Sequence, residues 1–303
     1  MFHIQLDHVT FSLKENHDFS WLSSLGTVFA VFDQNDSGNI SFGVKNDDGS
    51  FFIKVAGLAA INSLRTKEEN VLSLKEAMNV YENIQHPHLI QLVKHYAIDD
   101  LYVAIFKWVD GDCLFDHWNF TKYEKNPQLL PPSKRFRQLP LSQRVKLSNI
   151  LFSFLETVSD SGYVAVDFYD GSIIYDFQND LMTICDIDLF RKKPAWNDIG
   201  KDYWGTKRLK APEEYQYGAS IDEITNIYTL GALLFDSFFG NYTELELQKR
   251  YQKCAFAPCS PENWELNSEC YRVARKAVNK DRNERYSSIL EFYKEWQRAI
   301  NTL

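Results

Sequence analysis

The sequence predicts an α+β fold, in which a small strand-rich lobe precedes a larger helix-rich lobe with a cleft between them. Three observations carry this prediction. The first hundred residues alternate apolar, β-branched runs with turn sequences such as NDSGN and NDDG. Residues 141–162 place apolar side chains at helical spacing and close on Gly162. A chain of 303 residues, 45% hydrophobic, is long enough for two such lobes.

The first lobe is expected to cover residues 1–109, with residues 1–26 as an N-terminal extension. A charged helix is predicted from about Asn62 to Gln85, between the third and fourth strands. The predicted strands, in chain order, are 27–32 (TVFAVF), 40–45 (ISFGVK), 50–56 (SFFIKVA), 89–98 (LIQLVKHYAI) and 101–109 (LYVAIFKWV).

The second lobe is expected to cover residues 110–303 and to be mostly helical. Short strands are predicted at 172–176 (SIIYD) and 181–189 (LMTICDIDL), and helix from residue 222 to the end. Asn119 to Pro140 is polar, basic and proline-containing, which is typical of a surface insertion.

Composition limits the class of partner. The net charge of −8 and the pI near 5.4 argue against a protein that coats nucleic acid. Five cysteines without a C-x-x-C pair indicate free thiols in a reducing compartment, and they argue against zinc. The charged N-terminus is unlike a secretory signal, and no apolar run of about eighteen residues predicts a membrane span. We therefore expect a cytoplasmic protein that binds neither nucleic acid nor membrane.

Several segments, in the right order, resemble eukaryotic-type protein kinases over roughly Thr27 to Ala299. They are HPHLIQL (86–92), KWVDGDCLFDHW (107–118), GTKRLKAPEEY (205–215), NIYTLGALLF (226–235) and KDRNERYSS (280–288). The resemblance implies the bilobal protein-kinase-like fold, with a β-rich N-lobe and a helical C-lobe. The segment ending in APE and the helix after it favour protein kinases over small-molecule kinases of the same fold.

The resemblance implies ATP and Mg²⁺ as ligands and assigns three charged residues. Lys54 in FFIKVA matches the lysine that contacts the phosphates, although a strand lysine reaching solvent is the plain alternative. Asp186 in TICDIDLF matches the aspartate that holds magnesium, and its alternative is a turn aspartate. Asp167 in VAVDFYDGS matches the carboxylate that orients the attacking hydroxyl.

The supports of these residues depart from the family. Val166 stands where the family has an arginine, and Tyr169 where it has the lysine that steadies the transferred phosphate. Ser172 replaces an asparagine that ligates magnesium, and its hydroxyl remains a candidate ligand. Asp188 replaces a glycine; it either ligates metal or caps the turn.

The residues expected to bind the nucleotide depart further from the kinase pattern. Only Gly38 remains of the three loop glycines, so fewer backbone amides approach the phosphates closely. Phe52 replaces a small alanine and either blocks the adenine pocket or stacks on the base. Ile40 and Phe106 are the other expected apolar walls, below a hinge from Lys107 to Val109.

Three further positions concern the frame around the site. The glutamate expected to pair with Lys54 falls at Ala77, with Glu76 one residue away. Glu213 and Arg285 match a buried ion pair, and Asn226 matches an aspartate that tethers the catalytic loop. Thr206 matches a threonine that contacts the catalytic aspartate in serine/threonine kinases.

The sequence therefore predicts a divergent serine/threonine kinase-like phosphotransferase. Two alternatives remain: a pseudokinase that acts as a binding or scaffold module, and a small-molecule kinase. The protein substrate or partner is unknown. Lys134, Arg135 and Arg137 suggest either a solvated loop or a docking site for an acidic protein.

Overall fold

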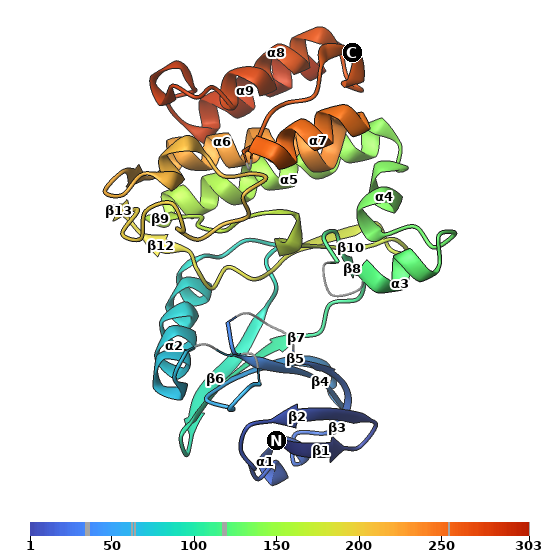
Figure 1. The fold of residues 1–303 in the computed structure, drawn as a ribbon, viewed down its shortest axis with the longest axis vertical. Coiled ribbons are helices and arrows are strands. Elements are labelled where there is room, and N and C mark those ends of the chain that lie inside the picture. The colour runs from blue at the N-terminus through green and yellow to red at the C-terminus, as the bar shows by residue number, and fades with distance from the viewer. Residues whose placement is uncertain (34–36, 62, 64, 117–119, 254, 303) are drawn as a thin grey trace. The chain divides into compact units, whose positions relative to one another are not determined.

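The computed structural model describes residues 1–33, 37–61, 63, 65–116, 120–253 and 255–302. The chain forms two compact units. Unit 1 comprises Met1–Asn83 and Leu89–Asp110, and unit 2 comprises Ile84–His88 and Gly111–Leu303. Unit 1 is built mainly of strands and unit 2 mainly of helices (Figure 1). The predicted α+β class is therefore confirmed.

Unit 1 is organised around a five-stranded antiparallel sheet in the order β3-β4-β5-β7-β6. Its strands are β3 (Thr27–Phe32), β4 (Ile40–Asn46), β5 (Gly49–Ala56), β6 (Leu92–Ile98) and β7 (Leu101–Lys107). The NDDG sequence forms the turn between β4 and β5, and Asp99 and Asp100 form the turn between β6 and β7. These tight turns join sequence neighbours into hairpins, which fixes most of the strand order.

The expected N-terminal extension is an integral part of unit 1. It forms a hairpin of β1 (Phe2–Leu6) and β2 (Val9–Leu13), followed by the short helix α1 (Ser20–Ser23). Its apolar side chains enter the same core as the inner face of the large sheet; they are Val9, Phe11, Leu13, Phe19 and Leu22. Removing residues 1–26 would therefore expose that face of the sheet.

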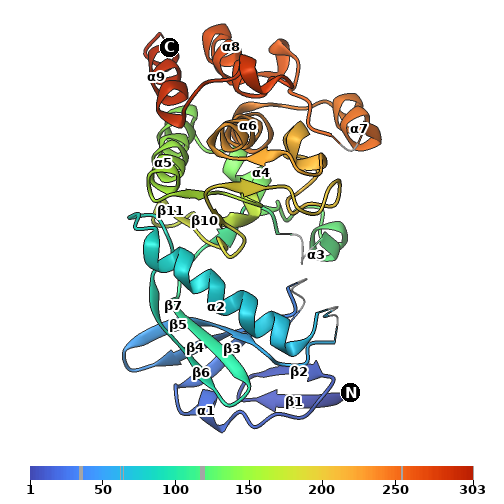
Figure 2. The same ribbon diagram turned by 90° about the vertical axis from the view of Figure 1, so that its left-hand side faces the viewer.

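The helix α2 (Lys67–Asn83) covers the other face of the sheet, as Figure 2 shows. Tyr81 of α2 contacts Phe106 of β7, with ring centroids 4.9 Å apart. Phe106 precedes β7's last residue and alternates with Ile105, which points into the opposite core. The sheet is thus buried on both faces.

Unit 2 is built mainly from helices, and some of them begin with a side-chain cap. The helices are α3 (Phe120–Lys125), α4 (Pro132–Arg137), α5 (Leu141–Asp160), α6 (Glu223–Leu233), α7 (Glu244–Lys253), α8 (Ser268–Ala277) and α9 (Ile289–Ile300). A π-helical turn, Leu234–Phe239, continues α6. The Asp222 side chain accepts a hydrogen bond from the Ile224 N–H at the start of α6, which satisfies a free backbone donor. Within the described residues, no helix is long and apolar enough to cross a membrane.

Short strand pairs hold the loops of unit 2. They are β8 (Asp112–Cys113) and β11 (Leu181–Ile184) on either side of β10 (Ile173–Asp176), β9 (Tyr163–Val164) with β12 (Arg191–Lys192), and β13 (Ala195–Trp196) with β14 (Ser220–Ile221). The segment Ile84–His88 belongs to this unit because the His88 carbonyl accepts a hydrogen bond from the Ile184 N–H at 2.6 Å. Residues 84–88, which were expected in the first lobe, therefore lie in unit 2.

The segment predicted as a surface insertion contains two helices. Asn119 lies outside the described residues, but the rest contains α3 and α4 rather than an irregular loop. Phe136 of α4 is fully buried, with its ring 5.4 Å from that of Tyr175 and 5.1 Å from that of Phe238. The polar composition concealed this one large apolar side chain, whose burial makes α4 part of the core.

Candidate functional site

Asp167 lies in the loop after β9 with a left-handed backbone, at φ 58°. Asp186, directly after β11, has the same conformation at φ 53°. Non-glycine residues seldom adopt positive φ, although aspartate tolerates it better than most. The other described aspartates with positive φ are Asp7, Asp99 and Asp180, and all three lie in hairpin turns. Asp167 and Asp186 take the conformation outside any hairpin, which is common at functional sites.

The side chain of Asn226 in α6 is hydrogen-bonded to the backbone of Ala165, two residues before Asp167. Its Oδ1 accepts from the Ala165 N–H at 2.9 Å, and its Nδ2 donates to the Ala165 carbonyl at 2.6 Å. Asn226 and Ala165 are both buried. Asn226 donates one of the two hydrogen bonds through its side-chain NH₂ group, which an aspartate does not have. The predicted tether is confirmed, with two hydrogen bonds to the backbone of one residue, Ala165.

The electrostatics of Asp167 favour its neutral form. Burial raises the pKa of Asp167 to about 7, and the negative charge of Asp186 adds to the rise. The positive charge of Lys210 and a hydrogen bond from the Thr206 N–H oppose it. The predicted contact of Thr206 with Asp167 is thus present, and the backbone makes it. A carboxyl group with this pKa exchanges protons close to neutral pH.

The turn after β11 exposes Asp186 and buries its neighbour. The Cys185 N–H donates to the Ser172 carbonyl at 2.9 Å, which joins this turn to the Asp167 loop. Ile187 is fully buried, and the Asp186 side chain is exposed. Ile187 therefore anchors the turn as a buried apolar residue. Asp188 is half-buried.

Ser172 and Asp186 carry the oxygen donors expected from the sequence as Mg²⁺ ligands, and the Cys185–Ser172 hydrogen bond joins their two segments. Ser172 is fully buried, and its hydroxyl has no hydrogen-bond partner among the described residues. A buried hydroxyl without a partner costs free energy that an ion or water would recover. No three His, Cys, Asp or Glu side chains gather as a metal site in the part of the chain described. Mg²⁺ does not require three, because it keeps several waters and uses one or two carboxylates.

Tyr169 is the residue for which the resemblance to protein kinases implied a lysine. Burial raises the pKa of Tyr169 well above its usual value, and the charges of Asp167 and Asp186 add to the rise. Its ring contacts Phe115 edge-on, with centroids 6.1 Å apart. The phenol is therefore neutral and brings no positive charge to this group of carboxylates.

An ion network that the sequence did not predict lies beside the loop. Arg208 contacts the carboxylates of Asp170 and Asp236, and Arg250 contacts Asp236 at 2.7 Å. Ser237 donates to Asp170 at 3.2 Å. These residues come from four separate segments, so no local pattern could have revealed them. The network fixes Asp170, three residues after Asp167, to the end of α6 and to α7.

In unit 1, Lys54 lies on the central strand β5, between Ser41 of β4 and Ala104 of β7. The residue is 9% exposed, which does not fit a strand lysine that reaches solvent. Phe52 and Lys54 share one face of β5, and Ile53 and Val55 point to the other. Lys54 is thus held on the face that α2 covers.

Ile40, expected as a wall beside Phe52, lies on the opposite face of the sheet. Ile40 pairs with Val55, and both belong to the core formed with the β1–β2 hairpin, on the opposite face of the sheet. The β4 residue opposite Lys54 is Ser41. A shift of one residue along a strand exchanges the two faces, and the sequence count was one residue off.

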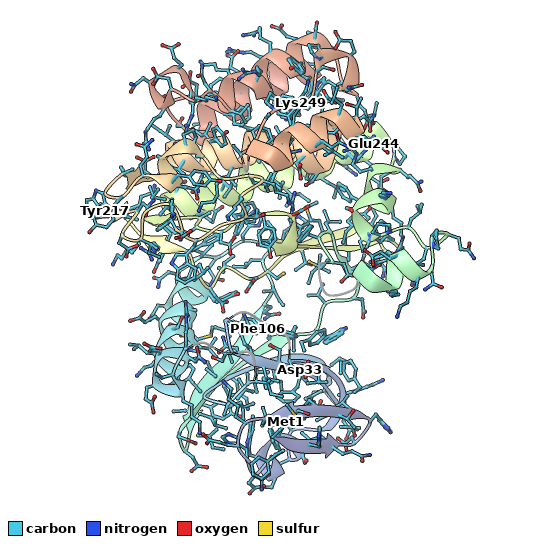
Figure 3. All side chains as sticks on the ribbon, in the orientation of Figure 1. Met1, Asp33, Phe106, Tyr217, Glu244 and Lys249 are labelled. Carbon is cyan, nitrogen blue, oxygen red and sulfur yellow. The ribbon has the colours of Figure 1, made fainter. Side chains whose placement is uncertain are left out.

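Aromatic rings line the face around Phe52. Its ring lies 6.4 Å from that of Phe106 and 5.7 Å from that of Phe32. Phe106 is labelled in Figure 3. At the end of β7, the Lys107 N–H donates to the Gln91 carbonyl at 2.9 Å, so this hinge amide is already engaged. Lys107 is exposed and Val109 is half-buried.

Gly38 is needed for packing within unit 1. It has φ 76°, and a Cβ placed there would come within 2.3 Å of the Ser63 hydroxyl and 2.7 Å of the Asn70 amide. Asn70 is a buried residue of α2. Gly38 therefore lets its backbone segment approach α2 and Ser63 closely. Asn35 and Asp36, the neighbouring part of the predicted loop, lie outside the described residues.

Helix α2 presents no carboxylate at the expected position. Ala77 is buried on the side facing the sheet, and Glu76 is exposed. The residue facing inward at this level of α2 is therefore uncharged, and the helix carries no one-residue irregularity that would turn Glu76 inward.

No protein-family model matches the chain.

Proposed function

We propose that the chain is a divergent, protein-kinase-like phosphotransferase that moves the terminal phosphate of ATP to a serine or threonine hydroxyl. In this proposal units 1 and 2 correspond to the N-lobe and the C-lobe of that fold. The observation that carries the proposal is the setting of Asp167: a carboxylate with a left-handed backbone, clasped through Ala165 by Asn226, and with a pKa of about 7.

A pKa near 7 suits Asp167 to accept the proton of an attacking hydroxyl. General bases work best when their pKa lies near the operating pH, because the basic form is then populated and still a good acceptor. An ordinary aspartate with a pKa near 3.9 would be a weaker base. Burial beside Asp186 therefore supports a role in proton transfer.

The candidate ligands fall into two groups. In unit 2, Asp186 and Ser172 are the residues that would hold Mg²⁺, with Asp188 as a further carboxylate. When bound, Mg²⁺ neutralises charge on the phosphates. In unit 1, Lys54 is the candidate phosphate ligand, and Phe52 and Phe106 are apolar surfaces for a base.

The test is transfer of radioactive phosphate from γ-labelled ATP, with Mg²⁺, to a mixture of serine- and threonine-containing peptides and to the protein itself. Asp167→Asn should lower transfer at least about 100-fold and leave ATP affinity in calorimetry nearly unchanged. Asp99→Asn is the matched control, since Asp99 has the same backbone conformation in an exposed hairpin turn. Undiminished transfer by the Asp167→Asn protein would refute the assignment.

A pseudokinase is the second candidate, and two observations in unit 1 favour it. Ala77 stands on the buried side of α2 where a carboxylate would pair with Lys54. Gly38 is committed to contacts with Ser63 and Asn70. ATP binding without transfer to peptide, protein or water would decide for this candidate.

A further inference from the structure

A lysine with no role assigned from the sequence lies beside Asp167. Lys210 precedes the 3₁₀ turn Pro212–Tyr215 by two residues and is only 5% exposed. Lysine is seldom buried to this degree unless its ammonium has partners. Here the ammonium donates to the Tyr203 carbonyl oxygen and lies 4.7 Å from the centre of the Tyr215 ring.

Two hydrogen bonds connect Lys210 to Asp167 through Thr206. The Lys210 N–H donates to the Thr206 carbonyl at 3.2 Å, and the Thr206 N–H donates to the Asp167 carboxylate. Tyr203, which receives the Lys210 ammonium, packs in one apolar cluster with Val166, the residue before Asp167. The lysine is thereby fixed to the same segment that holds the aspartate.

The stem of Lys210 also explains a glycine. A Cβ at Gly205 would come within 3.2 Å of Lys210 Cγ and 3.6 Å of Glu214 Oε1, and Gly205 has φ 120°. Glycine tolerates both the close contact and the backbone conformation. Gly205 therefore lets the turn close over the lysine.

The positive charge of Lys210 acts on two carboxyl groups, the buried Glu214 and the half-buried Asp167. Of the other cations on this segment, Arg208 is committed to Asp170 and Asp236, and Lys207 is exposed. Tyr169 is uncharged. Lys210 is thus the cation whose charge favours the ionised form of Asp167.

We infer that Lys210 is a positioning residue for Asp167 and supplies, from the segment before Pro212, the positive charge that is missing at Tyr169. The inference rests on the proposed phosphotransferase function. In this arrangement Lys210 supplies the cation near Asp167, because position 169 holds a tyrosine in place of the expected lysine.

The experiment compares kcat and KM for phosphate transfer from γ-labelled ATP in five proteins: wild type, Lys210→Met, Lys207→Met, Tyr169→Lys, and the double variant Lys210→Met with Tyr169→Lys. Lys210→Met should lower kcat about 100-fold and change KM for ATP less than about twofold. Lys207→Met is the matched control because Lys207 is an exposed lysine of the same turn, and its kcat should stay within about twofold of wild type.

The double variant separates a charge effect from a structural one. Tyr169→Lys should restore kcat at least about tenfold in the Lys210→Met protein and change it less than about threefold in the wild type, because coupled residues are not additive. A lysine needed only for folding would not be rescued from position 169. Near-UV circular dichroism and thermal unfolding show whether Lys210→Met is folded. If it is not, Lys210→Gln takes its place in the same comparison.

The failures can be told apart. If the wild type transfers no phosphate, the proposed function is wrong and the inference falls with it. If the wild type is active and the position-210 variant keeps the kcat of the Lys207→Met control, the inference alone is wrong. An active wild type with no rescue by Tyr169→Lys also overturns it.

Discussion

The guanidinium of Arg285 donates to both carboxylate oxygens of Glu213, at 2.7 and 2.9 Å, in the interior of unit 2. Both residues are buried, and Thr225 donates a third hydrogen bond to the same carboxylate at 3.0 Å. Arg282 approaches it as well, at 3.3 Å. The buried pair predicted from the sequence is therefore confirmed, and it joins the segment after Ala211 to the residues before α9.

Arg285→Ala should destabilise the protein by about 3–5 kcal/mol, because it leaves the buried Glu213 carboxylate without its bidentate partner. Urea unfolding followed by circular dichroism measures this loss. Arg298→Ala is the control: its pair with Glu295 is exposed, so it should cost less than about 1 kcal/mol. Equal unfolding midpoints for the two variants would contradict the prediction.

Stability should fall as the pH rises because of Glu214. Burial raises the pKa of Glu214 to about 8, against the opposing effects of the Ala211 N–H and Lys210. A group whose pKa is raised on folding contributes stability below its unfolded value, and this stability is lost as the pH rises through about 8. Glu214→Gln cannot ionise, so its unfolding free energy should fall less than that of the wild type over this range.

Urea unfolding at about pH 5 and about pH 9 measures that difference, since most of the range between the unfolded pKa of 4.5 and the folded pKa of about 8 lies between these values. Glu269→Gln serves as the control, because Glu269 is exposed and its pKa is lowered by Arg272. A Glu214→Gln protein with the same pH dependence as the wild type would show that Glu214 is not buried in its neutral form.

Arg137 should behave as a structural residue of unit 2. It contacts the Glu265 carboxylate at 3.0 Å, and Arg144 contacts the same carboxylate. Arg137→Ala should lower the unfolding free energy by about 1–3 kcal/mol, as expected for a hydrogen bond to a charged group. Lys134→Ala, on the exposed side of α4, should change it by less than about 0.5 kcal/mol.

That result would bear on the docking hypothesis. Arg135 also has a partner, Asp112, at 2.8 Å. Charge reversal at Lys134 alone would then be the cleaner test of binding to an acidic protein, because it leaves unit 2 intact. Equal destabilisation by Lys134→Ala and Arg137→Ala would contradict the structural assignment of Arg137.

Mg²⁺-dependent stabilisation by ATP should depend on Asp186. A ligand present at a hundred times its Kd adds about 2.7 kcal/mol to the unfolding free energy, which raises the Tm measurably. Asp186→Asn should lose most of the shift produced by ATP and Mg²⁺, and Asp188→Asn should lose less, since Mg²⁺ needs only one or two carboxylates. Differential scanning fluorimetry with ATP, with and without Mg²⁺, measures both. A full shift in the Asp186→Asn protein would remove Asp186 from the metal site.

Much of the fold could be predicted from local patterns. The strands at 27–32 and 40–46 follow from apolar, β-branched runs separated by turn residues, and α5 from helical spacing that ends at Gly162. These signals depend on neighbours within a few residues, which is why they survive without tertiary information. The Glu213–Arg285 pair spans 72 positions, and only the ordered motifs made it predictable.

The side of the sheet to which each side chain points was less predictable. Ile40 and Ser41 are adjacent, yet one enters the core with the β1–β2 hairpin and the other pairs with Lys54. Because side chains alternate along a strand, an alignment that is wrong by one residue assigns the wrong face. The register of the hydrogen bonds between β4 and β5 decided this.

The sequence by itself determined the order of the elements, the α+β class and the presence of Asp167 and Asp186 in loops after short strands. Only the tertiary structure decided what surrounds those carboxylates. Lys210 comes 43 positions after Asp167, and the distance between them closes because Thr206 and Tyr203 fold back onto the Asp167 loop. The raised pKa of Asp167 has the same origin, since burial and the nearby charge of Asp186 exist only once the chain is folded.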